Sequence, residues 1–366
     1  MSEPNLDTIN KQIAYRSNVF YWQTDRAVEP QDAGAIWADR HRYFADDEIV
    51  SRANEVLTSD QVVSIEPLVA SSQTNLGNVN SVRSGVLTSG KEIIVRCHPK
   101  GIVNGYFHAE ALAAQIAKDS GLPSYSTLAV HDFEGEKDFS FQVIEKLSGI
   151  AIKNWLELHP EHEAKMVQQM GITMAKLHSI KVNSFGPFNN QLAQSGELKG
   201  LHSSYLEAVN AGLDFNLGVL LSEGIVEGNR LEAIKELFSA SKFIQNATPV
   251  LVHNDFADWN LLTDGNKISG ILDWDECVGG SYIGDIACWS TFFEPERLQP
   301  FLDGYFSETS KPDDFNDNFN LLRLRYTISK MTLRIRRYTW DPTEFMLQKI
   351  LIGKVHLQES LDYFGI

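Results

Sequence analysis

Two different periods of hydrophobic positions divide the chain into a strand-rich first part and a helical second part. Between residues 62 and 144, apolar residues form short runs or alternate with polar ones, which is typical of strands. This pattern predicts strands over residues 62–68, 81–87, 91–97, 127–131 and 139–144, with a hairpin turn at 88–90. Apolar residues at helical spacing, among them Ala109, Leu112 and Ala113, predict one helix over 106–119.

From Gly149 onward the helical period dominates, apart from a break at the stretch Phe185-Gly186-Pro187-Phe188. The predicted helices span residues 161–179, 201–223, 229–247, 283–293, 296–306, 315–337 and 342–364. The fold class is therefore predicted as α+β, with a small β-rich N-lobe carrying one main helix and a larger, mostly α-helical C-lobe. We expect the N-lobe to span 61–148 and the C-lobe 149–366, with a hinge at 145–149.

Residues 1–60 precede the first predicted strand and form a leader. Its aromatic stretch at 18–23 is unusual for a disordered tail, so we expect the leader to pack on the body of the protein. Helical spacing of Ile49, Ala53 and Leu57 predicts that part of it is a helix.

Composition narrows the classes of function. The net charge of −16 argues against a nucleic-acid partner and suits a cationic small molecule, although many proteins are acidic without such a role. The three cysteines lack the spacing of a zinc site and fit a reducing compartment. The N-terminus has no apolar signal segment and no run is long enough to span a bilayer, so a cytoplasmic protein without membrane contact is expected. The oligomeric state is left open.

One stretch near the last third of the chain carries the candidate chemistry. It places Asp255 five residues before Asn260, and Asp273 follows after a short apolar hairpin. Phosphoryl transfer needs a carboxylate beside the attacking hydroxyl and oxygen ligands for Mg²⁺. Asp255 is therefore the candidate catalytic base, and Asn260 and Asp273 are the candidate metal ligands. His253 is predicted to brace the loop through hydrogen bonds rather than to take part in the reaction.

The sequence from Leu251 to Trp289 resembles the aminoglycoside phosphotransferase family, the small-molecule branch of the protein-kinase-like fold. The resemblance covers about residues 62–306 and is strongest in the His-x-Asp-x-x-x-x-Asn and Ile-x-Asp-Trp motifs. Within the family it is nearest to hygromycin B phosphotransferase. Asn254, where the family commonly has glycine, departs from the pattern and reshapes the floor of the acceptor site.

The resemblance implies roles for further residues. Arg96 would bind the nucleotide phosphates and Glu110 would be its partner, while Asp285 would brace the catalytic loop. The phosphate-covering loop would include Gly77, Asn78 and Asn80, and the hinge would offer backbone groups of Glu145 and Leu147 to adenine.

The resemblance also implies transfer of the terminal phosphate of ATP or GTP, with Mg²⁺, to a hydroxyl of a small polar amine-bearing molecule such as an aminoglycoside antibiotic. Candidates for binding a cationic acceptor are Asp258, Trp259, Asp275 and Glu276, although each acid is also compatible with an ordinary structural role. Two alternatives remain: a metabolic kinase for choline, a sugar or an amino-alcohol, and a non-catalytic pseudokinase.

Overall fold

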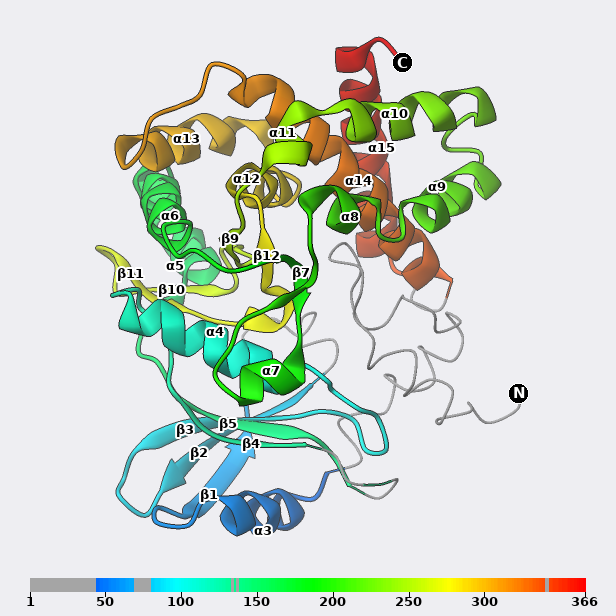
Figure 1. Cartoon of the computed structure of the whole chain (residues 1–366). Coiled ribbons are helices and arrows are strands. Elements are labelled where there is room, and N and C mark those ends of the chain that lie inside the picture. The colour runs from blue at the N-terminus through cyan, green and yellow to red at the C-terminus, as the bar shows by residue number, and fades with distance from the viewer. Residues whose placement is uncertain (1–43, 69–79, 133–134, 136–137, 340–341) are drawn as a thin grey trace.

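The N-lobe is built on a five-stranded antiparallel sheet in the order β1-β2-β3-β5-β4 (Figure 1). A computed structural model describes residues 44–68, 80–132, 135, 138–339 and 342–366. The strands are β1 (Val62–Pro67), β2 (Ser81–Leu87), β3 (Glu92–Cys97), β4 (Thr127–His131) and β5 (Phe141–Glu145). The predicted hairpin turn joins β2 to β3, where Gly90 takes the left-handed conformation with φ of 83°.

Helices cover both faces of this sheet (Figure 1). On one face, α3 (Asp46–Val56) buries Ile49 and Ala53 in a core with β-strand residues such as Val95, as its predicted helical spacing requires. The side chain of Asn54 joins the helix to the sheet, because it bonds both the N–H (2.7 Å) and the carbonyl (3.1 Å) of Val62. On the other face, α4 (Phe107–Asp119) lies between the sheet and the C-lobe. The leader before residue 44 lies outside the described residues.

The C-lobe holds two small sheets surrounded by helices. Their strand orders are β11-β10-β6 and β8-β7-β12-β9. The strands are β6 (Ile150–Ala151), β7 (Phe185–Phe188), β8 (Gly200–His202), β9 (Val250–Val252), β10 (Leu261–Thr263), β11 (Ile268–Ile271) and β12 (Val278–Gly280). The helices are α5 (Ile152–Leu158), α6 (Glu163–Leu177), α7 (Asn190–Gln194), α8 (Tyr205–Asn210), α9 (Leu213–Ser222), α10 (Leu231–Ala240), α11 (Lys242–Asn246), α12 (Tyr282–Ser290), α13 (Leu298–Ser307), α14 (Phe315–Tyr338) and α15 (Glu344–Phe364).

The predicted α+β class agrees with this architecture, but two predicted helices are wrong in detail. Residues 201–223 contain a strand end and two helices, because Gly212 takes a left-handed φ of 70° and separates α8 from α9. Residues 229–247 form α10 and α11, with Ser241 as the N-cap of the second. The break at 185–188 is a strand, β7, whose four residues are all buried. None of the helices in the described residues is long and apolar enough to cross a membrane.

Two glycines allow α6 and α13 to approach until their backbones touch. A Cβ on Gly171 would lie 2.1 Å from the carbonyl oxygen of Phe301, and a Cβ on Gly304 would lie 2.0 Å from that of Gln168. Non-bonded heavy atoms cannot approach each other this closely, so only glycine fits at these two positions.

The two lobes are joined by specific polar contacts close to the predicted site. The Tyr106 hydroxyl donates to the carbonyl of Cys277 and accepts from the N–H of Phe188 (2.9 Å). The indole N–H of Trp274 donates to the hydroxyl of Ser124 across the same boundary (3.1 Å). These buried contacts fix the start of α4 and the segment between α4 and β4 against β7 and the turn that follows β11.

Candidate active site

The loop between β9 and β10 presents Asp255 and Asn260 to each other. The side-chain amide of Asn260 donates to Asp255 Oδ2 (2.7 Å) and to the Asp255 carbonyl (3.0 Å). Since the amide nitrogen is used in this way, the Asn260 Oδ1 is the atom left to act as a ligand. The carbonyl of Asn260 accepts from the N–H of Leu272 (2.8 Å), which places the residue beside the end of β11 and hence beside Asp273.

Asp285, on α12, holds the start of this loop. Its two carboxylate oxygens accept from the backbone N–H groups of His253 and Asn254, each at 3.0 Å. His178 contacts the same carboxylate at 3.1 Å. Asn254 has φ of 67°, a conformation that asparagine tolerates better than most residues, and the two hydrogen bonds from consecutive N–H groups stabilise it. The loop geometry therefore depends on a buried carboxylate that lies thirty residues further along the chain.

His253 lies with its ring inside the loop. Its Nε2 is 2.9 Å from the carbonyl of Leu272, to which it donates, and its Nδ1 accepts from the N–H of Asp255 (3.3 Å). Both ring nitrogens are thus used within the protein, and the ring packs beside Trp274 with centroids 4.8 Å apart. This geometry suits the bracing role that the sequence predicts.

Arg96 connects the N-lobe to Asp273. From β3, its guanidinium donates to Glu110 on α4, to Gln142 on β5 (3.2 Å) and to Asp273 Oδ1 (2.7 Å). Arg96 and Glu110 are buried, whereas the Asp273 side chain is 42% exposed. The structure therefore brings together three residues that the sequence places in separate segments, and Asp273 keeps an oxygen and a solvent-facing side for another ligand.

Burial sets the protonation behaviour of the carboxylates here. It raises the pKa of Asp255, and the nearby charge of Asp273 raises it further, while Lys330 on α14 and the hydrogen bond from Asn260 act in the opposite direction. Burial and the charge of Asp273 raise the pKa of Asp275 well above its ordinary value. A carboxyl with a raised pKa is a better proton acceptor once it is ionised, which suits Asp255 as a base.

The predicted nucleotide-binding residues fall into two groups. Asn80 is buried and its Oδ1 lies 2.9 Å from His98 Nδ1, while Gly77 and Asn78 lie outside the described residues. At the end of β5, the N–H of Glu145 donates to the carbonyl of Ser126 (2.9 Å). This N–H is therefore not available to the adenine of a nucleotide. Leu147 lies directly after this strand, at the link between the lobes.

The predicted acceptor-binding residues are arranged differently from the expectation. Asp258 is buried and accepts from Arg297 Nη1 (2.8 Å), so its charge is neutralised within the protein. Asp275 is buried in the turn Trp274–Glu276, and Glu276 lies at the end of that turn. Trp259 is 41% exposed and contacts Phe292 and Phe293, with ring centroids 5.5 Å and 6.1 Å away.

Three residues at this site were missed by the sequence reasoning. Gln142 shares the guanidinium of Arg96, the Tyr326 hydroxyl donates to Asn254 Oδ1 (2.6 Å), and Lys330 is a nearby cation for Asp255. Tyr326 and Lys330 lie on α14, which packs against α12. No local pattern marks them, because their only relation to the catalytic loop is tertiary.

The donor set suits Mg²⁺ bound together with phosphates. No group of three or more His, Cys, Asp or Glu side chains in the described residues could hold a metal ion by itself. Mg²⁺ commonly takes one or two protein oxygens and completes its shell with phosphate and water. Asn260 Oδ1 and the partly exposed carboxylate of Asp273 are oxygens of this kind.

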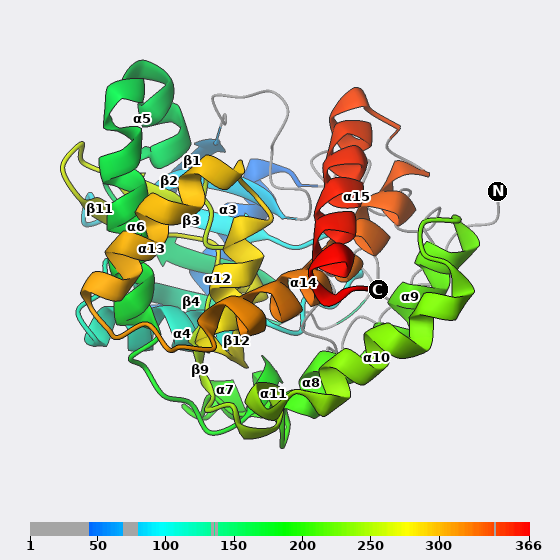
Figure 2. The same cartoon turned by 90° about the horizontal axis from the view of Figure 1, so that it is seen from above.

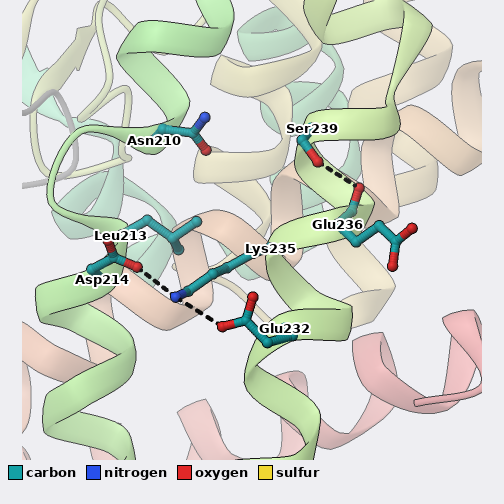
Figure 3. Close-up of a pocket in the computed structure, with 7 residues that line it drawn as sticks. All are labelled: Asn210, Leu213, Asp214, Glu232, Lys235, Glu236 and Ser239. Carbon is teal, nitrogen blue, oxygen red and sulfur yellow. Dashed lines mark hydrogen bonds and ion pairs between the residues drawn. The ribbon is translucent and has the colours of Figure 1, made fainter.

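A separate recess lies between α8, α9 and α10, away from the catalytic loop (Figure 3). Within it, Lys235 forms ion pairs with Asp214 (2.8 Å) and Glu232 (3.2 Å). These acids are more than four-fifths exposed, so the recess is a solvated surface feature that we do not assign to the site.

Comparisons with known proteins bear on the family and the fold. A model of the phosphotransferase enzyme family matches residues 77–316. Among solved structures, a thermostable mutant of aminoglycoside phosphotransferase APH(4)-Ia is similar with a TM-score of 0.60 and 14% identity, over 87% of this chain and 99% of that one. A putative fructosamine-3-kinase from Thermobifida fusca YX-ER1 is similar with a TM-score of 0.57 and 15% identity, over 84% and 99%.

A choline/ethanolamine kinase family protein from Mesorhizobium loti is similar with a TM-score of 0.54 and 15% identity, over 86% of this chain and 94% of that one. A search of curated protein sequences found no match. The similar structures confirm the predicted protein-kinase-like fold, with a β-rich N-lobe and a helical C-lobe.

Proposed function

Because this chain belongs to the phosphotransferase enzyme family, we propose that it transfers the terminal phosphate of ATP or GTP to a hydroxyl of a small molecule. The observation that carries the proposal is the placement of two hydrogen-bonded pairs, Asp255–Asn260 and Arg96–Asp273, each at 2.7 Å. The bond from the N–H of Leu272 to the carbonyl of Asn260 (2.8 Å) brings the two pairs side by side. A scaffold without catalysis would have no need for this connected set, which favours an active enzyme over a pseudokinase.

In the proposed step, the acceptor hydroxyl oxygen forms a bond to the terminal phosphorus. The bond from that phosphorus to the bridging oxygen breaks, and the nucleoside diphosphate leaves with the electron pair. The hydroxyl proton passes to the carboxylate of Asp255, whose raised pKa makes it a competent acceptor. Asn260 holds this carboxylate in place through its amide, so the base is oriented before the acceptor arrives.

Arg96 is proposed to bind the phosphates from the N-lobe side. Glu110 and Gln142 fix its guanidinium, which leaves the charge directed at the Asp273 edge of the site. Mg²⁺ held by Asn260 and Asp273 would neutralise the charge of the phosphates. Because the N–H of Glu145 is used within the sheet, hydrogen bonds to the purine of the nucleotide would come from other backbone groups of 145–147.

The class of acceptor has two candidates. The sequence predicts an amine-bearing molecule of the aminoglycoside type, and a similar structure is described as a ternary complex with AMP-PNP and hygromycin B. A metabolic kinase is the other, since similar structures include a putative fructosamine-3-kinase and a choline/ethanolamine kinase family protein. The likeness is of the same order for all of them, so it does not choose between the two.

A screen of nucleotide turnover tests the proposal. Purified protein with Mg²⁺ and either ATP or GTP is mixed with aminoglycosides, amino-alcohols, sugars and hydroxy acids, and release of the nucleoside diphosphate is followed by a coupled assay. We expect acceptor-dependent release with at least one class, confirmed by mass spectrometry of the phosphorylated product. Absence of any release, together with no Mg²⁺-dependent shift of the melting temperature by either nucleotide, would support the pseudokinase instead.

A further inference from the structure

The cations around the acceptor side of the catalytic loop contrast with the acidity of the whole chain. Lys330 and Arg334 lie one helical turn apart on α14, and Lys349 lies on the adjacent α15 (Figure 2). Lys153, on α5, begins the segment that bonds to the catalytic loop, because its N–H donates to the carbonyl of Asp258 (3.0 Å). We call Lys153, Lys330, Arg334 and Lys349 the cationic rim.

One member of the cationic rim, Lys330, lies beside the aromatic cluster that includes the exposed Trp259. The Lys330 ammonium lies 4.2 Å from the centre of the Phe292 ring, and that ring contacts Trp259. The same ammonium is a nearby cation for Asp255. Lys349 lies within electrostatic range of Lys153 and Asp258, so the charges extend along the far side of the loop.

These four cations have no carboxylate partner at salt-bridge distance among the residues that the structure describes. Arg334 donates to the backbone carbonyl of Lys349 (3.1 Å), and the acid with the largest electrostatic effect on Lys349 is the exposed Glu294, which forms no ion pair with it. All four side chains are half-buried. Half-buried cations without counter-charges are unfavourable, unless an anion joins them.

The pKa values of two residues of the cationic rim also indicate an environment that is unfavourable for positive charge. Burial lowers the pKa of the Arg334 guanidinium to about 10, and burial together with the charge of Arg334 lowers the pKa of Lys349. Glu294 opposes this effect on Lys349 without cancelling it. A bound anion would offset the burial that lowers both pKa values and the repulsion that Lys349 receives from Arg334.

The acids that would serve an amine-bearing acceptor are not similarly available. Asp258 is paired with Arg297, which also bonds Glu163. Asp275 is buried in the turn that follows β11. Two of the three acids predicted to bind an amine-bearing acceptor are therefore held inside the protein, one by an ion pair and the other by burial.

We infer that the acceptor carries an anionic group, a carboxylate or a phosphate, which the cationic rim binds while the acceptor hydroxyl lies at Asp255 and its apolar face lies on Trp259. The inference rests on the proposed phosphotransfer and replaces the amine-bearing acceptor with a hydroxy acid or a phosphorylated alcohol. The nucleotide is an alternative source of negative charge. Its expected position is the opposite side of the loop, where Arg96 and Asp273 lie.

Matched acceptors test the charge. Turnover of the full chain with Mg²⁺ and ATP is measured for glycerol, glycerate, glycerol 3-phosphate and ethanolamine, and for a sugar beside its sugar acid, sugar phosphate and amino sugar. The melting temperature of the Mg²⁺–ADP-loaded protein is recorded with each compound. We expect the anionic members to give the higher kcat/KM or the larger stabilisation, and the carboxylate and phosphate members show which group is preferred.

Variants of the cationic rim test the residues. Lys349→Gln and Lys330→Gln should each lower kcat/KM for the anionic acceptor by about 10- to 100-fold, the usual effect of losing a hydrogen bond to a charged group. Lys349→Gln should act through KM and leave the KM for ATP unchanged. Lys354 is an exposed lysine on α15, the helix of Lys349. Lys354→Gln is therefore the matched control and should retain wild-type kinetics.

The outcomes separate this inference from the proposed function. Equal or better transfer to the amine-bearing members overturns the anionic acceptor and leaves phosphotransfer standing. So does an effect of Lys349→Gln and Lys330→Gln on the KM for ATP alone, or a panel in which no anionic member reacts or stabilises more than its neutral counterpart. If nucleotide neither binds nor turns over, both the proposed function and this inference fail.

Discussion

Replacement of Asp255 by asparagine separates chemistry from binding at the proposed site. The two side chains have nearly the same shape, and the asparagine carbonyl can still accept the amide of Asn260 that lies 2.7 Å from Oδ2. The proton acceptor is lost, whereas Arg96, Asn260 and Asp273 remain. General base catalysis contributes about 10²- to 10⁴-fold, so kcat should fall by that factor, equivalent to about 3–5 kcal/mol in the barrier.

The same variant should be more stable than the wild type at neutral pH. Burial raises the pKa of Asp255 above its unfolded value, so the carboxyl binds its proton more tightly in the folded state. Stability therefore falls as the pH rises from the unfolded pKa to the folded pKa, and it stays lower above that range. Asparagine carries no charge at any of these pH values. The melting temperature of the Asp255→Asn variant should therefore exceed that of the wild type at pH 7, and the difference should vanish in acid.

The assay measures acceptor-dependent release of nucleoside diphosphate and, separately, Mg²⁺–nucleotide binding by calorimetry. Asp313→Asn, which changes an exposed carboxylate in the loop before α14, is the control and should match the wild type in both. Wild-type turnover by Asp255→Asn would refute the assignment of the base. Loss of nucleotide binding to the same extent as turnover would show that Asp255 acts on the nucleotide rather than on the acceptor.

Further variants test the residues that position the site and the packing of the helices around it. Arg96→Met removes the cation that compensates the buried Glu110 and should lower the free energy of unfolding by about 3–5 kcal/mol in a urea titration, while nucleotide binding is lost. Asp285→Ala leaves two backbone N–H groups without their acceptor and should cost about 2–6 kcal/mol with a matching loss of kcat; unchanged stability would contradict the bracing role. Gly171→Ala should destabilise by at least about 1–3 kcal/mol by forcing α6 and α13 apart. Gly218→Ala, a helical glycine with open space around it, should instead stabilise by about 0.5–1 kcal/mol, and equal effects of the two would refute the packing argument. For the wild type, kcat should rise with pH through the raised pKa of Asp255, a dependence that Asp255→Asn should lack.

The grouping of the candidate catalytic residues could be predicted from the sequence because they lie close together along the chain. Asp255 and Asn260 belong to one loop, and the hairpin of β10 and β11 returns the chain to Asp273 within a few residues. The periodic helices were also predictable, since α4 and α6 each bury a mostly apolar face. Local pattern was enough in these cases.

What the sequence could not supply is which charges meet in space. Asp258 looked like a free acid because Arg297, its partner, lies on another segment. Lys330 had no visible role because α14 meets the catalytic loop only in the folded protein, through its packing on α12 and the bond from Tyr326 to Asn254. β7 was missed for a related reason, since Phe185–Phe188 becomes a strand by pairing with β8 and β12 rather than through its own propensity.

The bond from Arg96 to Asp273 has a consequence for how metal and nucleotide bind. The guanidinium occupies Asp273 Oδ1, so a divalent ion at this carboxylate shares it with a cation of the same protein. Phosphates that draw Arg96 toward themselves would release Oδ1 to the ion, and metal and nucleotide would then bind with positive cooperativity. The arrangement would favour the metal–nucleotide complex over free Mg²⁺.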